Sequence, residues 1–191
     1  MRSAIFILLA VVSLSCGDLK PKEVDLYYNI QSLMVEQAAA LTADKVELQK
    51  FAIVNGDSST SAFVPDSLGW ADEFQIIMDA DINKPALRGQ YSISEGDDEN
   101  SNLKILAYTA NSETLPIQSF KVFYLDKVEN LKRIEVRMKE SNSIFQASKN
   151  IILDLDDIKN QNRITHYSIK GFQKMLLQDR VDFNVRCSLK Y

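Results

Sequence analysis

The second half of the sequence alternates apolar and polar residues with a period of two, and this pattern limits the folds open to the chain. Ile134, Val136 and Met138 alternate with charged residues, and the segment from Val181 to Leu189 alternates in the same way. Such alternation is typical of strands with one buried and one solvent-facing side. Further strands are expected at 90–94, 103–108, 117–125, 144–155 and 164–175. Because the polar breaks between them, such as 95–100 and 156–160, are short, we expect an antiparallel meander of about seven strands.

Two helices and a hairpin are expected before this meander. Apolar residues with a helical period predict a helix over 23–43, and Asn55-Gly56 predicts a tight turn between strands at 46–54 and 59–64. A second helix follows Pro65 with Asp66 as its cap, and it ends before Pro85. The sequence therefore predicts an α+β domain in which two helices cover the apolar face of a curved antiparallel sheet.

The amino-terminal segment carries an export signal. A positive start, Met1-Arg2, precedes an apolar run from Ala4 to Leu14. As a helix this run would be about 16 Å long, too short for a hydrocarbon core of about 30 Å, so we interpret residues 1–15 as a signal peptide. Residues 16–22 then form a short tether of at most about 25 Å, and residues 23–191 form one α+β domain.

Cys16 follows the apolar run directly, in Ser13-Leu14-Ser15-Cys16. This motif resembles the lipobox of bacterial lipoproteins, although its leucine lies one place nearer the cysteine than in the commonest form. The resemblance implies that Cys16 carries a thioether-linked diacylglyceryl group and an N-linked acyl chain such as palmitate, and that the protein's first partner is the lipid bilayer. The alternative is an ordinary cleaved signal that contains a cysteine.

The sequence offers little catalytic chemistry. His166 is the one histidine of the chain, and no nucleophile motif or Gly-rich phosphate loop accompanies it, so we expect it to face solvent on a strand. Cys187 lies in phase with Val185 and Leu189 and should point inward. We therefore predict no catalytic residue, no cofactor and no enzymatic activity.

The acidic residues around 154–160 invite a calcium-site interpretation. Asp154, Asp156, Asp157 and Asn160 are oxygen donors, but an EF-hand that began at Asp154 would need glycine at position 159 and glutamate at position 165. Lysine and threonine stand there. We expect solvated turns and no metal site. The formal net charge of −4 gives no basic surplus, so no nucleic-acid partner is expected either.

Several short segments resemble uncharacterised lipoproteins of Bacteroidota-type bacteria: Trp70-x-x-x-Phe74, the stretch from Asp81 to Tyr91, and Gly171-x-Gln173-Lys174. The resemblance implies a cell-envelope location, in the outer membrane, and carries no activity with it.

The leading hypothesis for function is a non-enzymatic binding module, which engages an envelope protein or an apolar ligand beside the membrane. Five residues are candidates for the lining of an apolar cavity, although aromatic residues in such positions more often form a plain core: Tyr27, Met34, Trp70, Phe74 and Tyr91. The alternative hypothesis is an acyl-chain or lipoprotein-carrier-like acceptor, similar to the LolA/LolB family, which holds acyl chains under a helix-covered curved sheet. An open space between helices and sheet would favour that alternative.

Overall fold

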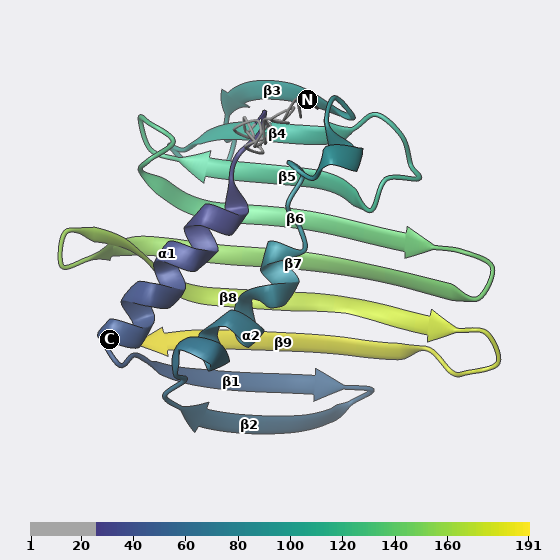
Figure 1. The fold of residues 1–191 in the computed structure, drawn as a ribbon, viewed down its shortest axis with the longest axis horizontal. Helices are drawn as coiled ribbons and strands as arrows, with labels where there is room; N and C mark the ends of the chain where they lie inside the picture. Colours follow the sequence, from purple (N-terminus) through teal and green to yellow (C-terminus); the bar gives the residue numbers. More distant parts are fainter. Residues whose placement is uncertain (1–25) are drawn as a thin grey trace, which may run out of the picture.

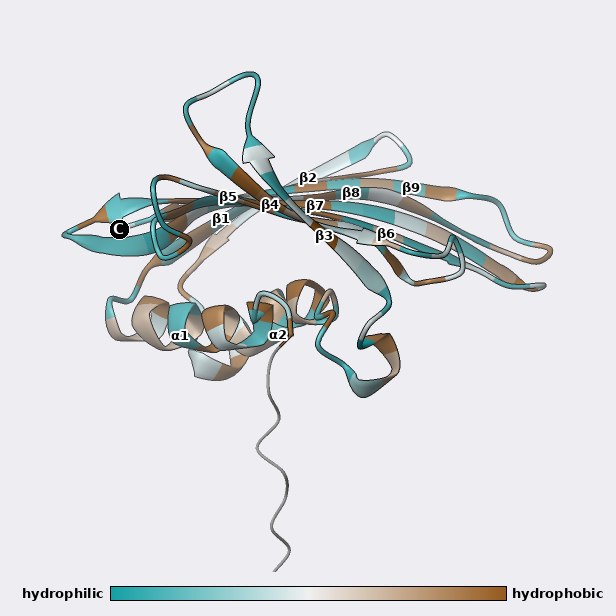
Figure 2. Cartoon of the chain, turned by 90° about the horizontal axis from the view of Figure 1, so that it is seen from above, coloured by the Kyte–Doolittle hydropathy of each residue, from teal (hydrophilic) through white to brown (hydrophobic). Residues whose placement is uncertain are grey.

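The computed structural model describes residues 26–191 and contains one antiparallel sheet with two helices on one face (Figures 1 and 2). The sheet has nine strands in the order β2-β1-β9-β8-β7-β6-β5-β4-β3. The elements are α1 (Ile30–Ala43), β1 (Glu47–Val54), β2 (Asp57–Phe63), α2 (Ser67–Met78), a short 3-10 helix η1 (Pro85–Leu87), β3 (Tyr91–Asp97), β4 (Lys104–Ala110), β5 (Ile117–Tyr124), β6 (Leu131–Ser141), β7 (Phe145–Ile158), β8 (Gln161–Met175) and β9 (Val181–Lys190). The predicted fold class is confirmed.

The meander from β3 to β9 follows the sequence pattern closely, because each strand pairs with its neighbour along the chain. The amino-terminal hairpin joins this sheet through β1, which pairs with β9 from Glu47 opposite Lys190 to Val54 opposite Phe183. Asn55 and Gly56 both have positive φ, 50° and 96°, so the predicted tight turn is confirmed. The hairpin therefore extends the sheet and forms one of its edges (Figure 1).

The predicted start of the first helix at residue 23 is wrong for residues 26–29, which precede α1 in a non-helical conformation. The Asn29 side chain caps α1 by accepting a hydrogen bond from the Ser32 amide. Asp66 caps α2 in the same way through Gly69, as predicted. The predicted polar breaks at 95–100 and 156–160 are partly wrong. Strand β3 continues to Asp97 and strand β7 to Ile158.

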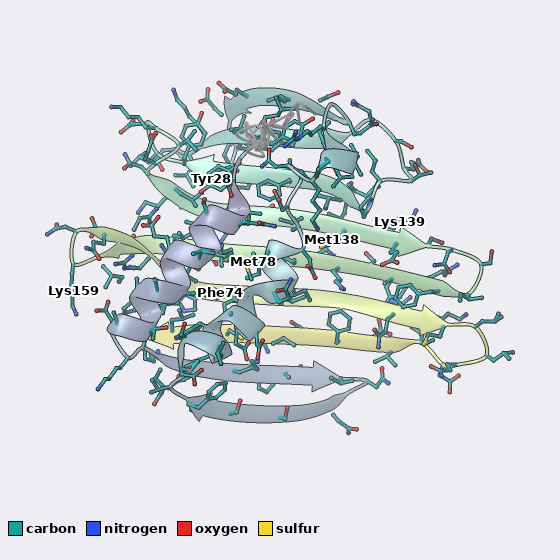
Figure 3. All side chains as sticks on the ribbon, viewed as in Figure 1. Tyr28, Phe74, Met78, Met138, Lys139 and Lys159 are labelled. Atoms are coloured by element: carbon teal, nitrogen blue, oxygen red, sulfur yellow. The ribbon has the colours of Figure 1, made fainter. Side chains whose placement is uncertain are left out.

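The core lies between the helices and the sheet (Figure 2). It is rich in aromatic and branched side chains. The buried stripe of α1 is Ile30, Met34, Gln37 and Leu41. The buried residues of α2 are Trp70, Phe74 and Ile77. Figure 3 places Phe74 over the middle of the sheet and Tyr28 at the start of α1. The other face of the sheet, called the outer face below, carries neither helix (Figure 2).

Candidate functional site

All five residues predicted as candidates for cavity lining lie in the core between the helices and the sheet. Met34 of α1 and Trp70 and Phe74 of α2 have no exposed surface, while Tyr27 is 8% and Tyr91 of β3 is 5% exposed. The structure therefore brings together residues far apart in the sequence. Whether they also line a ligand cavity stays a prediction.

The aromatic side chains of the core form two groups. At the β3 edge the ring of Tyr27 contacts Tyr91 and Tyr108 edge-on, with centroids 5.6 and 5.4 Å apart. Nearer β8, Trp70 lies 5.5 Å from Phe74, whose ring is 6.0 Å from that of Tyr167. Such edge-on and tilted pairs stabilise an aromatic core beyond the area they bury.

Each aromatic group holds a buried polar atom that has no hydrogen-bond partner in the described part of the chain. These atoms are Nε1 of Trp70 and the hydroxyl of Tyr91. Burial raises the pKa of Tyr91 to about 12, so its hydroxyl stays protonated at neutral pH. A buried donor without an acceptor is costly in a folded protein, and both donors could serve a ligand with acceptor oxygens.

Asn83 fixes the chain that leads into the domain. Its side-chain oxygen accepts hydrogen bonds from the amides of Leu26 and Tyr27, at 3.1 and 3.0 Å. Its Nδ2 donates to the carbonyl oxygens of Tyr27 and Tyr28, at 3.4 and 3.2 Å. The Tyr28 amide donates in turn to the Tyr108 hydroxyl at 3.0 Å. These bonds satisfy backbone groups that a longer helix would have used, which explains why α1 begins only at Ile30.

Cys187 lies beneath α2, and its thiol is buried. It is 3% exposed, and burial raises the pKa of its thiol even though Tyr167 and Lys50 oppose the shift. Nearby, Glu73 accepts hydrogen bonds from Lys50 at 2.5 Å and from the Tyr167 hydroxyl at 2.9 Å. This network joins α2 to β1 and β8. Lys50 and Tyr167 both donate their hydrogen bonds to Glu73.

The other predicted polar candidates lie apart from that network. His166 is exposed on the outer face, as predicted, with Nδ1 3.1 Å from the Thr165 hydroxyl. Asp156 pairs with Lys132 at 2.9 Å and Asp154 with Arg133 at 2.6 Å. Across residues 26–191 there is no group of three or more histidine, cysteine or acidic side chains placed to hold a metal ion.

Sequence reasoning missed one further surface, at the ends of the β6–β7 and β8–β9 hairpins, which lie at the same end of the sheet (Figure 1). Four large apolar side chains are exposed there: Ile144 by 61%, Met175 by 48%, Leu176 by 61% and Leu177 by 97%. We call these four residues the apolar tip. The Leu176 amide donates to the Ile144 carbonyl oxygen at 2.8 Å, so the two turns are held together. The signal in the sequence was Met175-Leu176-Leu177 beside a turn.

Cys16 lies outside the described residues, so its predicted acylation stays a prediction. Among residues 26–191, neither helix has the length and apolar character needed to cross a bilayer.

Comparison with known proteins does not show a family for this chain. No protein-family model and no curated protein matches the chain. Among solved structures, the chain is similar to a LolA superfamily protein, NE2245 from Nitrosomonas europaea. The two chains are 9% identical over 86% of this chain and 94% of that one, with a TM-score of 0.31.

Proposed function

We propose that the protein is a lipid-anchored cell-envelope module that binds its partners while its apolar tip rests in the bilayer surface. The acylated Cys16 is the first membrane contact in this proposal, and the apolar tip is the second. The proposed location is the outer membrane, and the proposed role is non-enzymatic. The single observation that carries the proposal is the exposure and backbone conformation of Leu177.

Leu177 combines a side chain that contributes nothing to the stability of the fold with an unfavourable backbone conformation. Its side chain is 97% exposed, and its backbone lies in the left-handed region, with φ of 64°. Glycine or asparagine is the favoured residue for such a turn position. A leucine that gains nothing from the fold, in an unfavourable backbone conformation, points to a role outside the fold.

The surroundings of Leu177 suit a lipid surface better than a flat protein surface. Residues 141–146 and 175–178 contain no charged side chain, while Glu140, Lys174, Asp179 and the Arg180–Asp182 ion pair of 2.7 Å lie just behind them. In a bilayer, an apolar end would lie among the acyl chains and the charged side chains behind it would lie at the headgroups, which basic side chains can reach through their flexible stems. Full burial of a leucine side chain contributes about 1.5–3 kcal/mol, so the tip would strengthen an acyl anchor and would hold the membrane only weakly by itself.

The test measures co-flotation with zwitterionic phosphatidylcholine vesicles. The full chain carries Cys16→Ser, so that no acyl chain contributes, and it is compared with the same chain carrying Leu177→Asn in addition. Asparagine relieves the backbone strain, so we expect the free energy of unfolding to stay equal or rise by up to about 1 kcal/mol. We also expect vesicle binding to fall about tenfold, the equivalent of about 1.4 kcal/mol.

The matched control is Leu68→Asn in the same background, because Leu68 is 76% exposed on α2, away from the apolar tip. It should leave vesicle binding unchanged. Equal binding by the parent and the Leu177→Asn chain, or an equal loss in the Leu68→Asn chain, would refute the proposed role of the tip.

A second candidate function is that of an acyl-chain acceptor, and the two unpartnered donors in the core favour it. A fatty-acid carboxylate could accept a hydrogen bond from Trp70 Nε1 or from the Tyr91 hydroxyl while its chain lies under the helices. Trp70 is the one tryptophan of the chain, so a brominated fatty acid should quench its fluorescence on entry. Unchanged fluorescence at saturating lipid would eliminate this candidate.

A further inference from the structure

Several cations of the outer face have no ion pair within residues 26–191, although the whole chain has a formal net charge of −4, and four of them lie in two neighbouring rows of the sheet. These four are Lys121 of β5, Arg137 of β6, Lys170 of β8 and Arg186 of β9. In the part of the chain that the structure describes, none of them has a carboxylate oxygen within 4 Å. We call these four residues the cationic face.

Strand register places the cationic face in two neighbouring rows across the sheet. In the first row Lys121 lies opposite Glu135, and Arg186 lies opposite Ser168 and Phe51. In the second row Asn150 lies between Arg137 and Lys170. Since successive residues of a strand alternate between faces, the core positions Ile134, Ile151, Tyr167 and Cys187 confirm that both rows point away from the helices.

In the second row an amide, Asn150, lies between Arg137 and Lys170, whereas in the first row Glu135, Ile152 and Ser168 lie between Lys121 and Arg186. Ser119, Asn150, Ser168 and Asn184 occupy the two rows, and the guanidinium of Arg186 lies 5.0 Å from the centre of the Phe51 ring at one end. Shallow hollows lie at both ends of the face, one beside Lys121 and Arg137 and one beside Phe51 and Arg186. Several carboxylates on this face are paired with other cations: Glu135 and Asp154 with Arg133, Asp156 with Lys132, and Asp182 with Arg180.

The spacing of the four cations indicates how long a ligand must be to contact all of them. Neighbouring strands lie about 4.8 Å apart, so Arg137 and Lys170 are about 10 Å apart and Lys121 and Arg186 about 19 Å apart. One small anion cannot reach all four. A chain with repeated carboxylate or phosphate groups can, because both arginines can bind such groups through two parallel hydrogen bonds.

We propose that the cationic face binds an acidic polysaccharide. The Asn150 amide between Arg137 and Lys170 and the Ser168 hydroxyl beside Arg186 match the hydroxyl groups and anions of such a chain. Phe51 offers an apolar surface for a sugar ring. Single-stranded nucleic acid is a poorer fit, because sheet surfaces bind it through several exposed aromatic rings, whereas on this face the guanidinium of Arg180 covers the ring of Phe172, 3.8 Å from its centre. The ligand is also not the anchoring bilayer: Lys170 is five residues from Met175, or about 17 Å along the strand, beyond a headgroup layer of about 5–7 Å.

The experiment measures binding of the full chain with Cys16→Ser to alginate oligosaccharides in the absence of membranes, so its outcome is independent of the apolar tip. We expect saturable binding that weakens with salt and no binding of neutral dextran of equal length. Loss of two cations in Arg137→Gln with Lys170→Gln should weaken alginate binding at least about tenfold. The matched control, Lys127→Gln with Lys159→Gln, removes the same charge from exposed turns and should change affinity less than about twofold.

Three results would overturn the proposal. The first is the absence of saturable alginate binding, and the second is an equal loss of binding in the control chain. The third is binding of poly-glutamate or oligouridylate as tight as that of alginate, because a face that selects glycans should distinguish them from other polyanions.

Discussion

Asn83 shows how one buried amide can determine where an element begins. The sequence suggested only that Asn83-Lys84-Pro85 ends the second helix. In the structure the Asn83 side chain, 8% exposed, also bonds the backbone of Leu26 and Tyr27. That role depends on the folded arrangement of segments more than fifty residues apart, and no local pattern encodes it.

Replacement of Asn83 by alanine should therefore destabilise the domain by about 2–3 kcal/mol, because several buried backbone groups lose their partners. Urea unfolding measures the change. Asn100→Ala, in an exposed turn, is the matched control and should change the free energy of unfolding by less than about 0.5 kcal/mol. If the two variants are equally stable, Asn83 does not hold the entering chain.

The buried tyrosines predict a loss of stability at alkaline pH. Burial raises the pKa of Tyr28 and of Tyr91 from 10.0 to about 12, and it also raises the pKa of Tyr108 and Tyr167. Between these values the unfolded chain releases protons that the folded chain keeps, so stability is fully present below pH 10 and falls as pH rises toward 12. Unfolding free energies measured across this range should decline, together with a late rise in tyrosinate absorbance. A flat profile would contradict the burial of these hydroxyls.

At the scale of elements, the packing of β7 against β8 requires a glycine. A Cβ atom on Gly171 would lie 2.0 Å from the carbonyl oxygen of Ser148 on the neighbouring strand. Backbone at that distance has to shift, so Gly171→Ala should destabilise the sheet by about 1–3 kcal/mol.

Gly96 supplies the matched control, because it also lies in a strand and a Cβ there would meet nothing within 4 Å. Gly96→Ala should leave the thermal midpoint equal or higher, since alanine lowers the entropy of the unfolded chain. A midpoint for Gly171→Ala as high as for Gly96→Ala would show that the two strands can separate without cost.

The elements themselves were largely predictable, and their partners were predictable only where connections are short. Alternation located the strands of the meander, and short turns determined their order. The pairing of β1 with β9 joins Glu47 to Lys190, and no periodicity specifies which sheet edge a hairpin joins.

The helices show the same limit. The buried stripe of α1 was predicted, but Gln37 within it was not assigned a role. Its side chain bonds the Asn162 carbonyl oxygen and the Ile164 amide, both at 3.0 Å, beside a bulge in β8. The same limit applies to the candidate site. The sequence identified the five core residues. The apolar tip and the cationic face were not predicted, because each consists of residues that only the folded sheet brings together.

At the scale of the whole molecule, the two proposals assign different surfaces to the membrane and to the polysaccharide. The hairpin ends would meet the bilayer, and the outer face would stand free beside it with its cations above the headgroups. Helices and core would connect the two surfaces. The eleven residues from Cys16 to Leu26 reach at most about 35 Å, so the anchor and the domain would stay close to the same membrane.

The most direct test of this account is mass spectrometry of the amino-terminal peptide, from protein purified out of the membranes of a bacterium that matures lipoproteins. The account predicts a chain that begins at Cys16 and carries the added mass of a diacylglyceryl group and an N-linked acyl chain. A chain with an unmodified Cys16, or one recovered from the medium without acyl mass, would contradict it.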